Sequence, residues 1–295
     1  MFDRAQLAAF VAVLETGGFA TAAQVLSITQ SAITQRVKAL EEETGQMLLL
    51  RQRPARPTRA GAALLRYARQ LELLDQGLDA ALTSGSAGRA VCSIAVNSDS
   101  LATWFTDAWE RIARECGILL QVLVEDQEHT ARLLADGTVS GVVTSAEAPL
   151  QGCTARRLGI MDYVCVAGND FYARHFADKP IKLALREAPA IRFNAKDFIH
   201  SGFVWKHFRI GADEMPMHDI PSPVTLLDGV RRDLAYAFVP ELQARPLLDS
   251  GTLVEIFPGK KASVPLFWHE WTMDHTVLQQ VGKRVLAAAK ASLRQ

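Results

Sequence analysis

The sequence lacks the features that mark secreted and membrane-spanning proteins. Only four cysteines occur, Cys92, Cys116, Cys153 and Cys165, and they form neither a CxxC pair nor a disulfide framework. Such usage suits a reducing compartment. No apolar run approaches the roughly 18 residues of a membrane span, and no basic region precedes the apolar stretch near the N-terminus. We therefore expect a cytoplasmic protein with no membrane partner.

Net charge and familiar catalytic motifs are missing as well. Because 32 Lys and Arg balance 32 Asp and Glu, a surface for nucleic acid would have to be local. The chain contains no GxSxG, HExxH, P-loop or GxGxxG motif, and its seven histidines show no metal-ligand spacing. His269 and Glu270 are interpreted as a structural pair. We expect no enzyme, no metal and no cofactor.

The first part of the chain predicts three helices and a hairpin. Apolar residues recur at helical spacing over 2–15 and 19–26, and a third helix begins near Thr29 or Gln30. Gly45 is the stop signal of that third helix. The segment 47–58, MLLLRQRPARPT, is apolar and then basic, and it indicates a short hairpin or wing. Two short helices joined by a tight turn are typical of a helix-turn-helix.

The third helix has a charge order that suits DNA. Its start is polar, and its carboxylates, Glu41, Glu42 and Glu43, stand at the far end. Because a recognition helix enters the major groove N-terminus first, this order keeps negative charge away from phosphates. Base edges are assigned to Thr29, Gln30, Ser31, Thr34 and Gln35. Phosphate contacts are assigned to Arg36, Lys38, Arg51, Arg53 and Arg56. The alternative is a helical bundle whose polar face meets only water.

A long helix over 59–82 follows, and Thr58 is placed to cap it. Its apolar positions, spaced by three or four residues, are Leu64, Ala68, Leu71, Leu74, Leu78 and Leu82. Pairing this apolar seam with the same seam of a second chain would bury both and place two recognition helices about one DNA turn apart. The alternative is a seam packed on the chain's own C-terminal part. Ser84–Gly88, SGSAG, is predicted to be a flexible linker.

After residue 89 the pattern changes to alternating strands and helices. Strands are predicted at 91–96, 118–124 and 139–145, with helices over 100–116 and 128–136 between them, which indicates a parallel sheet. A strand at 163–168 enters a second lobe with strands at 189–193 and 234–240 and a helix over 222–231. A strand at 265–271 returns to the first lobe, and a last helix begins near residue 274. The fold class is α/β multidomain. The predicted units are 1–58, 59–88 and 89–295, with lobe I at 89–163 and 266–295 and lobe II at 164–265.

Polar side chains follow the predicted strands and mark a small-molecule site, because ligands of open α/β lobes bind beyond the carboxyl ends of strands. The candidates are Asn97, Ser98, Asp99, Ser100, Glu125, Asp126, Thr144, Ser145 and Ser222. Helix N-termini near Ser100 and Ser222 suit a carboxylate, and Asp99 suits a cation. Simple helix capping is the alternative for Asp99 and Ser100.

The stretch FATAAQVLSITQSAITQRVKALEEETGQMLLLRQRPARPTRAG, residues 19–61, resembles the N-terminal domain of LysR-type transcriptional regulators. The resemblance covers the whole chain. It implies a winged helix-turn-helix, a linker helix and a two-lobed domain like a periplasmic binding protein. It also implies double-stranded DNA, a second copy of the chain (a homodimer, commonly assembled into a homotetramer) and RNA polymerase as partners.

Three further segments are similar to the lysine- and arginine-responsive ArgP/LysG branch of that family. They are AVNSDSLATW at 95–104, VLVEDQEHT at 122–130 and LGIMDYVCVAG at 158–168. The branch controls basic amino-acid export, so the resemblance implies lysine or arginine as effector. The chain departs from the branch at Pro221, Pro223, Val224 and Asp233, and an effector of another kind is therefore the alternative. A nonspecific nucleoid protein and a small-molecule enzyme are remoter alternatives.

Overall fold

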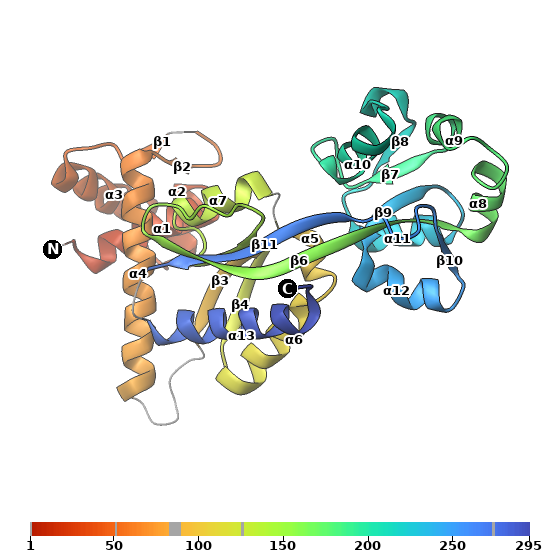
Figure 1. Ribbon diagram of the computed structural model, residues 1–295. Helices are drawn as coiled ribbons and strands as arrows, with labels where there is room; N and C mark the ends of the chain where they lie inside the picture. The colour runs from red at the N-terminus through yellow and green to blue at the C-terminus, as the bar shows by residue number, and fades with distance from the viewer. Residues whose placement is uncertain (1, 51, 83–89, 125–126, 273–274) are drawn as a thin grey trace.

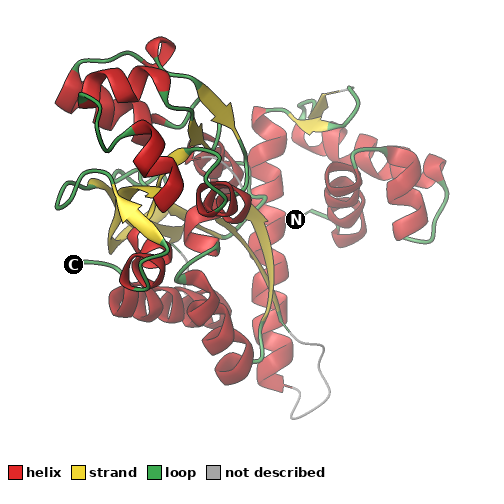
Figure 2. Ribbon diagram, turned by 90° about the vertical axis from the view of Figure 1, so that its right-hand side faces the viewer, coloured by secondary structure: helices red, strands yellow, loops and turns green. Residues whose placement is uncertain are grey.

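The computed structural model describes residues 2–50, 52–82, 90–124, 127–272 and 275–295 (Figure 1). The predicted linker Ser84–Gly88 lies outside the described residues. The N-terminal domain and a two-lobed domain stand on either side of one long helix, as Figure 2 shows.

The N-terminal domain packs helices around a small core and carries a hairpin. Its elements are α1 (Arg4–Thr16), α2 (Phe19–Val25), α3 (Gln30–Thr44), β1 (Leu49–Leu50) and β2 (Arg56–Pro57). Phe10, Ile33 and Leu40 are fully buried in this core. Gly45 ends α3 in the left-handed conformation, with φ of 65°, which a residue without Cβ adopts at no steric cost. The predicted helix-turn-helix and wing are confirmed.

The long helix is α4 (Arg59–Leu82). Thr58 caps it as expected, because its Oγ1 accepts a hydrogen bond from Gly61 N at 3.0 Å. Among the described residues, no single helix has the length and apolar character of a membrane span. Only α1 and α2 taken together, bent by 118°, meet that criterion.

Lobe I is built on strands in the order β4-β3-β5-β11. Its strands are β3 (Val91–Val96), β4 (Leu119–Val124), β5 (Gly141–Thr144) and β11 (Ala262–Trp271). Its helices are α5 (Ser98–Leu101), α6 (Phe105–Arg111), a π-helical turn (Ile112–Cys116), α7 (Gln127–Ala135) and α13 (Thr276–Ser292). β3 is parallel to β4 and β5, as predicted, whereas β11 is antiparallel to β5.

The prediction of a single helix over 100–116 was wrong. The chain breaks between α5 and α6, and the end of α6 widens into the π-helical turn. Trp104 at the break is buried, while Trp109 remains 57% exposed. The apolar residues of this segment therefore belong to two short helices and the break between them, and only some of these residues face the core.

Lobe II continues the same sheet in the order β6-β9-β7-β8, with β10 also pairing with β6. Its strands are β6 (Cys153–Gly168), β7 (Ala190–Arg192), β8 (Met217–Asp219), β9 (Tyr236–Pro240) and β10 (Leu253–Glu255). Its helices are α8 (Asn169–His175), α9 (Ile181–Glu187), α10 (Phe198–Phe208), a 3₁₀ turn (Ala212–Glu214), α11 (Pro223–Arg231) and α12 (Glu241–Asp249).

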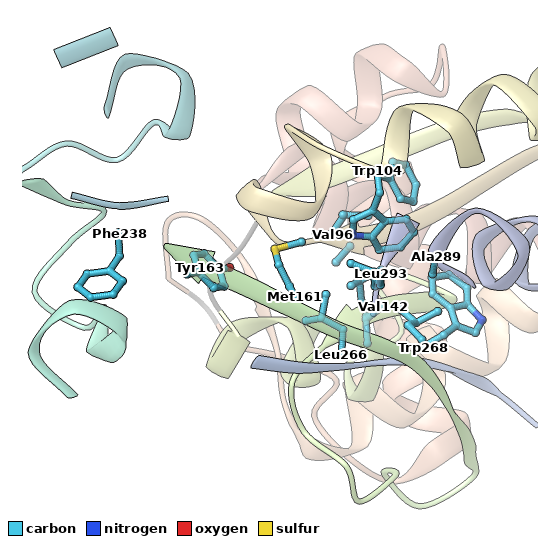
Figure 3. Packing of buried hydrophobic residues seen from close by; sticks show 14 of the residues in the cluster. Val96, Trp104, Val142, Met161, Tyr163, Phe238, Leu266, Trp268, Ala289 and Leu293 are labelled. Carbon is cyan, nitrogen blue, oxygen red and sulfur yellow. The ribbon is translucent and has the colours of Figure 1, made fainter. Parts of the chain in front are cut away.

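Two long strands, β6 and β11, join the lobes, as Figure 1 shows. The predicted strand 163–168 is the second half of β6, which already begins in lobe I. Figure 3 places Trp104 and Trp268 in the lobe I core and Phe238 on the far side, with Tyr163 of β6 between them. Tyr163 therefore stands at the crossover between the lobes, where the proposed lobe boundary falls within a continuous strand.

Candidate DNA-binding surface and interlobe cleft

The start of α3 presents a row of polar side chains to solvent. The residues assigned to base edges are all exposed, namely Thr29, Gln30, Ser31, Thr34 and Gln35. Thr29 is the N-cap, and its Oγ1 accepts from Ala32 N at 3.2 Å. Thr34 Oγ1 donates to Gln30 O at 2.9 Å, and Gln35 next to it is exposed. This face has the donors and acceptors that a major groove requires.

The opposite face and the far end of α3 hold the helix in place. Ile33, Val37 and Leu40 are buried against the domain core. Glu41 Oε1 accepts a hydrogen bond from Leu48 N at 2.9 Å and so ties α3 to the wing. Glu41 thus serves a structural role at the end of the helix that is remote from its polar start.

The residues assigned to phosphates surround this face. Lys38 and the wing residues Arg53 and Arg56 are exposed, and Arg36 is partly exposed. Lys38 pairs with Glu42 at 3.4 Å, but both side chains are largely solvated, so the pair contributes little and leaves the ammonium available to a phosphate. Arg51 lies outside the described residues.

The turn before α3 holds a residue that sequence reasoning missed. Ser27 adopts φ of 54°, and the backbone N–H of Ile28 donates back to Ala23 O at 3.0 Å. A non-glycine residue in this region costs about 1–2 kcal/mol. The sequence carries no signal for it, because serine at a helix end ordinarily indicates a cap.

The predicted seam of α4 has two different environments. Leu64 and Ala68 are buried in the core of the N-terminal domain, and Leu71 packs partly against it. Leu74 is 47% exposed. The side chains of Leu78 and Leu82 lie outside the described residues. The first half of the seam therefore joins α4 to its own N-terminal domain, and Leu74 is the described position that is open to a second copy.

A cleft of about 770 Å³ lies between the two lobes. Lobe I contributes Asn97, Ser98 and Asp99, all predicted, from the end of β3 and the start of α5. The crossover contributes Tyr163 and residues 261–264. The lobe II wall consists of residues 193–194, 196–199, 202–203 and 206–207, and most of them belong to α10.

Asp99 is the central charged group of this cleft. Burial raises its pKa to about 6, a hydrogen bond from Tyr163 opposes that rise, and the negative charge of Asp197 adds to it. Tyr163 OH donates to Asp99 Oδ2 at 2.7 Å, which fixes the carboxylate toward the crossover. A partly buried carboxylate that faces a second carboxylate is stabilised by a cation.

Asp197 of lobe II was missed by the sequence reasoning. Its Oδ1 accepts from Ile199 N at 3.0 Å as the N-cap of α10, and its Oδ2 accepts from Phe193 N at 3.2 Å. The signal was an Asp directly before an apolar helical segment. Sequence reasoning did not assign that segment to a helix, so its cap had no place in the predicted site.

The other predicted effector residues that the structure describes lie apart from the cleft lining. Ser100 is fully buried, and its Oγ has no hydrogen-bond partner among the described residues. Thr144 is buried and accepts from Ala146 N at 3.2 Å, and Ser145 follows it at the end of β5. Ser222 caps α11 by accepting from Thr225 N at 3.3 Å. Glu125 and Asp126 lie outside the described residues. Of the predicted set, Asn97, Ser98 and Asp99 meet at the cleft.

Ion pairs and hydrogen bonds fix residues of the two long strands, β6 and β11. Arg294 near the C-terminus donates to both oxygens of Asp162, at 2.7 and 2.8 Å, and holds its pKa below the usual range. Ser263, which lines the cleft, donates to the same carboxylate at 2.6 Å. Glu270 binds Trp268 Nε1 at 2.7 Å and also pairs with Arg156. Glu270 therefore has structural partners, and His269 is not one of them.

The departures from the branch lie away from the cleft lining. Asp233 adopts φ of 58°, and its Oδ1 accepts from Phe171 N at 2.9 Å in the first turn of α8. Arg174 donates to its carbonyl oxygen at 3.0 Å. Val224 is 62% exposed at the start of α11, and no residue of α11 lines the cleft.

A winged helix-turn-helix joined to a two-lobed domain with an interlobe cleft defines a ligand-responsive DNA-binding protein. The model of the bacterial regulatory helix-turn-helix proteins of the lysR family matches residues 5–62. The model of the LysR substrate binding domain matches residues 85–270. The chain belongs to the LysR family, and it is a LysR-type DNA-binding transcriptional regulator.

Individual relatives and solved structures of this family are similar to the chain over nearly its whole length. The transcriptional regulator ArgP of Vibrio cholerae serotype O1 is 35% identical over 294 residues, which are 99% of each chain. The crystal structure of ArgP from Mycobacterium tuberculosis matches with a TM-score of 0.87 and 37% identity over 100% of this chain and 99% of that one. Full-length LysG from Corynebacterium glutamicum with bound effector Arg matches with a TM-score of 0.80 and 32% identity over 99% and 100%. The predicted resemblance and fold class are confirmed.

Proposed function

We propose that this regulator responds to a basic amino acid, lysine or arginine, that binds in the interlobe cleft. It acts in the cytoplasm as a homodimer or homotetramer and controls a basic amino-acid exporter or related metabolism. The observation that carries the proposal is the carboxylate of Asp99, partly buried and facing the negative charge of Asp197 across the cleft. The bound arginine of the similar LysG structure supports the same chemistry.

The two walls of the cleft suit the two ends of such a ligand. Asp99 on lobe I takes the ammonium or guanidinium of the side chain, with Asn97 and Ser98 beside it. Lobe II carries Lys196 and Lys206 along the cleft, and these supply the charge opposite to an α-carboxylate. A ligand with one cation and one carboxylate separated by a flexible chain therefore binds both lobes.

The mechanism of the response follows from a ligand that contacts both lobes. A ligand that contacts the two walls favours the closed arrangement of the lobes over the open one. The lobes then shift within the oligomer, which changes the spacing of the recognition helices and the bend of the DNA between them. A coupling of about 1–3 kcal/mol corresponds to a 5- to 150-fold change in operator affinity. Contact with RNA polymerase follows from the family resemblance.

The first test is a footprint on the DNA upstream of the protein's own gene and its neighbour, with and without lysine and arginine. We expect a protected inverted repeat whose extent changes with either amino acid. Norleucine and citrulline are the controls, because norleucine keeps the carbon chain of lysine without its ammonium group and citrulline is a neutral isostere of arginine. Protection that does not change with lysine or arginine would still support a DNA-binding regulator, but it would exclude these two amino acids as effectors.

The second test places the ligand. Asp99→Ala should abolish the response to the amino acid and leave DNA binding without effector intact, because Asp99 lies far from α3. Isothermal titration with the same ligands measures the binding step directly. A normal response in the variant would move the effector site elsewhere.

A further inference from the structure

The linker helix touches lobe I at a point where only a glycine fits. Gly137 follows α7 and is buried, with φ of +77°. A Cβ at this position would lie 2.6 Å from both Cα and N of Arg66 in α4. Real Cβ atoms do not approach backbone so closely, so the two backbones meet here because Gly137 has no side chain.

Neighbouring residues extend this contact into a small interface. Arg66 and Gln70, one helical turn apart on α4, share a cavity of about 350 Å³ with Gln151, Gly152 and Thr272 of lobe I. The side chains of Leu64 and Ala68 lie on another face of α4 and pack into the N-terminal domain. One turn of α4 is therefore held from two sides, by the N-terminal domain and by lobe I, the two parts that flank the long helix in Figure 2.

The same turn is connected to the cleft through α7. Because α7 links two strands, β4 and β5, that both run parallel to β3, it leads from the carboxyl ends of the strands back to their amino ends. The carboxyl end of β3 leads into Asn97 at the cleft, and Gly137 lies at the other end of α7. Leu134 is fully buried, and its carbonyl oxygen accepts from Trp271 Nε1 at 3.3 Å. A helix fixed in this way moves with lobe I as one body.

We propose that the Arg66–Gln70 face of α4 is a docking surface for the chain's own lobe I, and that the contact at Gly137 carries the state of the cleft to the DNA-binding helices. The role of the Gly137 contact in transmission rests on the proposed function, whereas the docking surface does not. A contact between two backbones transmits a displacement of α7 to α4 directly, because no flexible side chain lies between them.

The test is Gly137→Ala, with Gly137→Asn as a second variant. Both add a Cβ that must displace Arg66, but Asn tolerates a positive φ, so a shared effect comes from the lost contact and not from backbone strain. Gly117→Ala is the matched control, because Gly117 also has positive φ, +66°, but nothing lies within 4 Å of its Cβ position. Thermal unfolding of each variant checks the fold.

The first readout needs no effector. The thiol of Cys153 lies at the edge of this interface, where burial raises its pKa and the nearby charge of Arg66 lowers it. Cys92 and Cys165 are buried, so a Cys116→Ser background isolates Cys153 for alkylation by iodoacetamide. We expect both Gly137 variants to react at least about fivefold faster than the background protein and the Gly117→Ala control. Equal rates in all four proteins would overturn the docking surface.

The second readout is operator affinity with and without lysine and arginine. We expect the response of the Gly137 variants to fall to within about twofold of none, while ligand affinity in isothermal titration changes less than about threefold. A full response in variants whose Cys153 has become reactive would overturn the transmission role. If the unaltered protein binds neither amino acid, the proposed function fails, and the alkylation result still decides the docking surface.

Discussion

Replacing Asp99 by asparagine should stabilise the protein without effector while it removes the response. Burial and the facing Asp197 raise the pKa of Asp99 from 3.8 to about 6, so the ionised form is held in the fold at a cost. That difference corresponds to about 3 kcal/mol at pH 7.5. Asparagine has the same shape, can still accept the hydrogen bond from Tyr163, and carries no charge. Allowing for partial exposure, we expect a gain of about 1–3 kcal/mol.

The sign of the pH dependence follows from the direction of the shift. A group whose pKa is raised by folding contributes stability that is fully present below its unfolded value of 3.8 and is lost as pH rises through about 6. The advantage of Asp99→Asn should therefore be largest above pH 7 and fall to about half at pH 5. For a domain of about 200 residues, a gain of 1–3 kcal/mol raises Tm by roughly 2–12 °C.

The assay is thermal unfolding at pH 7.5 and pH 5, with Asp162→Asn as the matched control. Asp162 lies on β6 next to Tyr163 and is paired with Arg294, which lowers the pKa of its carboxyl group. Its stabilising contribution is present above its unfolded pKa, so Asp162→Asn should lower Tm at pH 7.5. A lower Tm for Asp99→Asn at pH 7.5, or a gain that does not change between the two pH values, would refute the argument.

Three further substitutions test other parts of the molecule. Gln35→Ala should weaken operator binding by about 1–3 kcal/mol and random-DNA binding much less; equal losses in a titration of both DNAs would remove its role as a base reader. Gly61→Ala should destabilise the N-terminal domain by about 1–3 kcal/mol or more in thermal unfolding, because its Cβ would lie 1.9 Å from Leu48 O; Gly18→Ala, with open space, is the control. Asp233→Ala should cost about 1–2 kcal/mol in denaturant unfolding, because it loses the bond to the α8 backbone at a positive φ, whereas Asp233→Gly should cost less.

Local signals predicted the N-terminal domain well. Thr29 and Gly45 mark the ends of α3 because a hydroxyl caps the first N–H groups and a glycine accepts a positive φ. The strand 91–96 was predicted with its observed bounds. These features depend on a few neighbouring residues, so they are readable without the tertiary structure.

Elements whose stability comes from distant contacts were harder to predict. The break between α5 and α6 contains neither proline nor glycine, and the burial of Trp104 at the break is a tertiary contact. The edge strands β8 and β10 are each three residues long, too short for a periodic pattern. The helix predicted over 59–82 is present as α4, but the periodicity of its apolar residues cannot tell which partner covers it.

The sequence by itself determined the class of this protein: a polar recognition helix, a basic wing, a long linker helix and alternating strands and helices. It also placed Asn97, Ser98 and Asp99 at the end of a strand, because the carboxyl end of a parallel strand is defined by the chain itself. Only the tertiary structure decided which groups face each other. Tyr163 and Asp99 are 64 residues apart, and Gly137 meets Arg66 across a domain boundary. Such pairs form when the whole fold closes, and local preference carries no information about them.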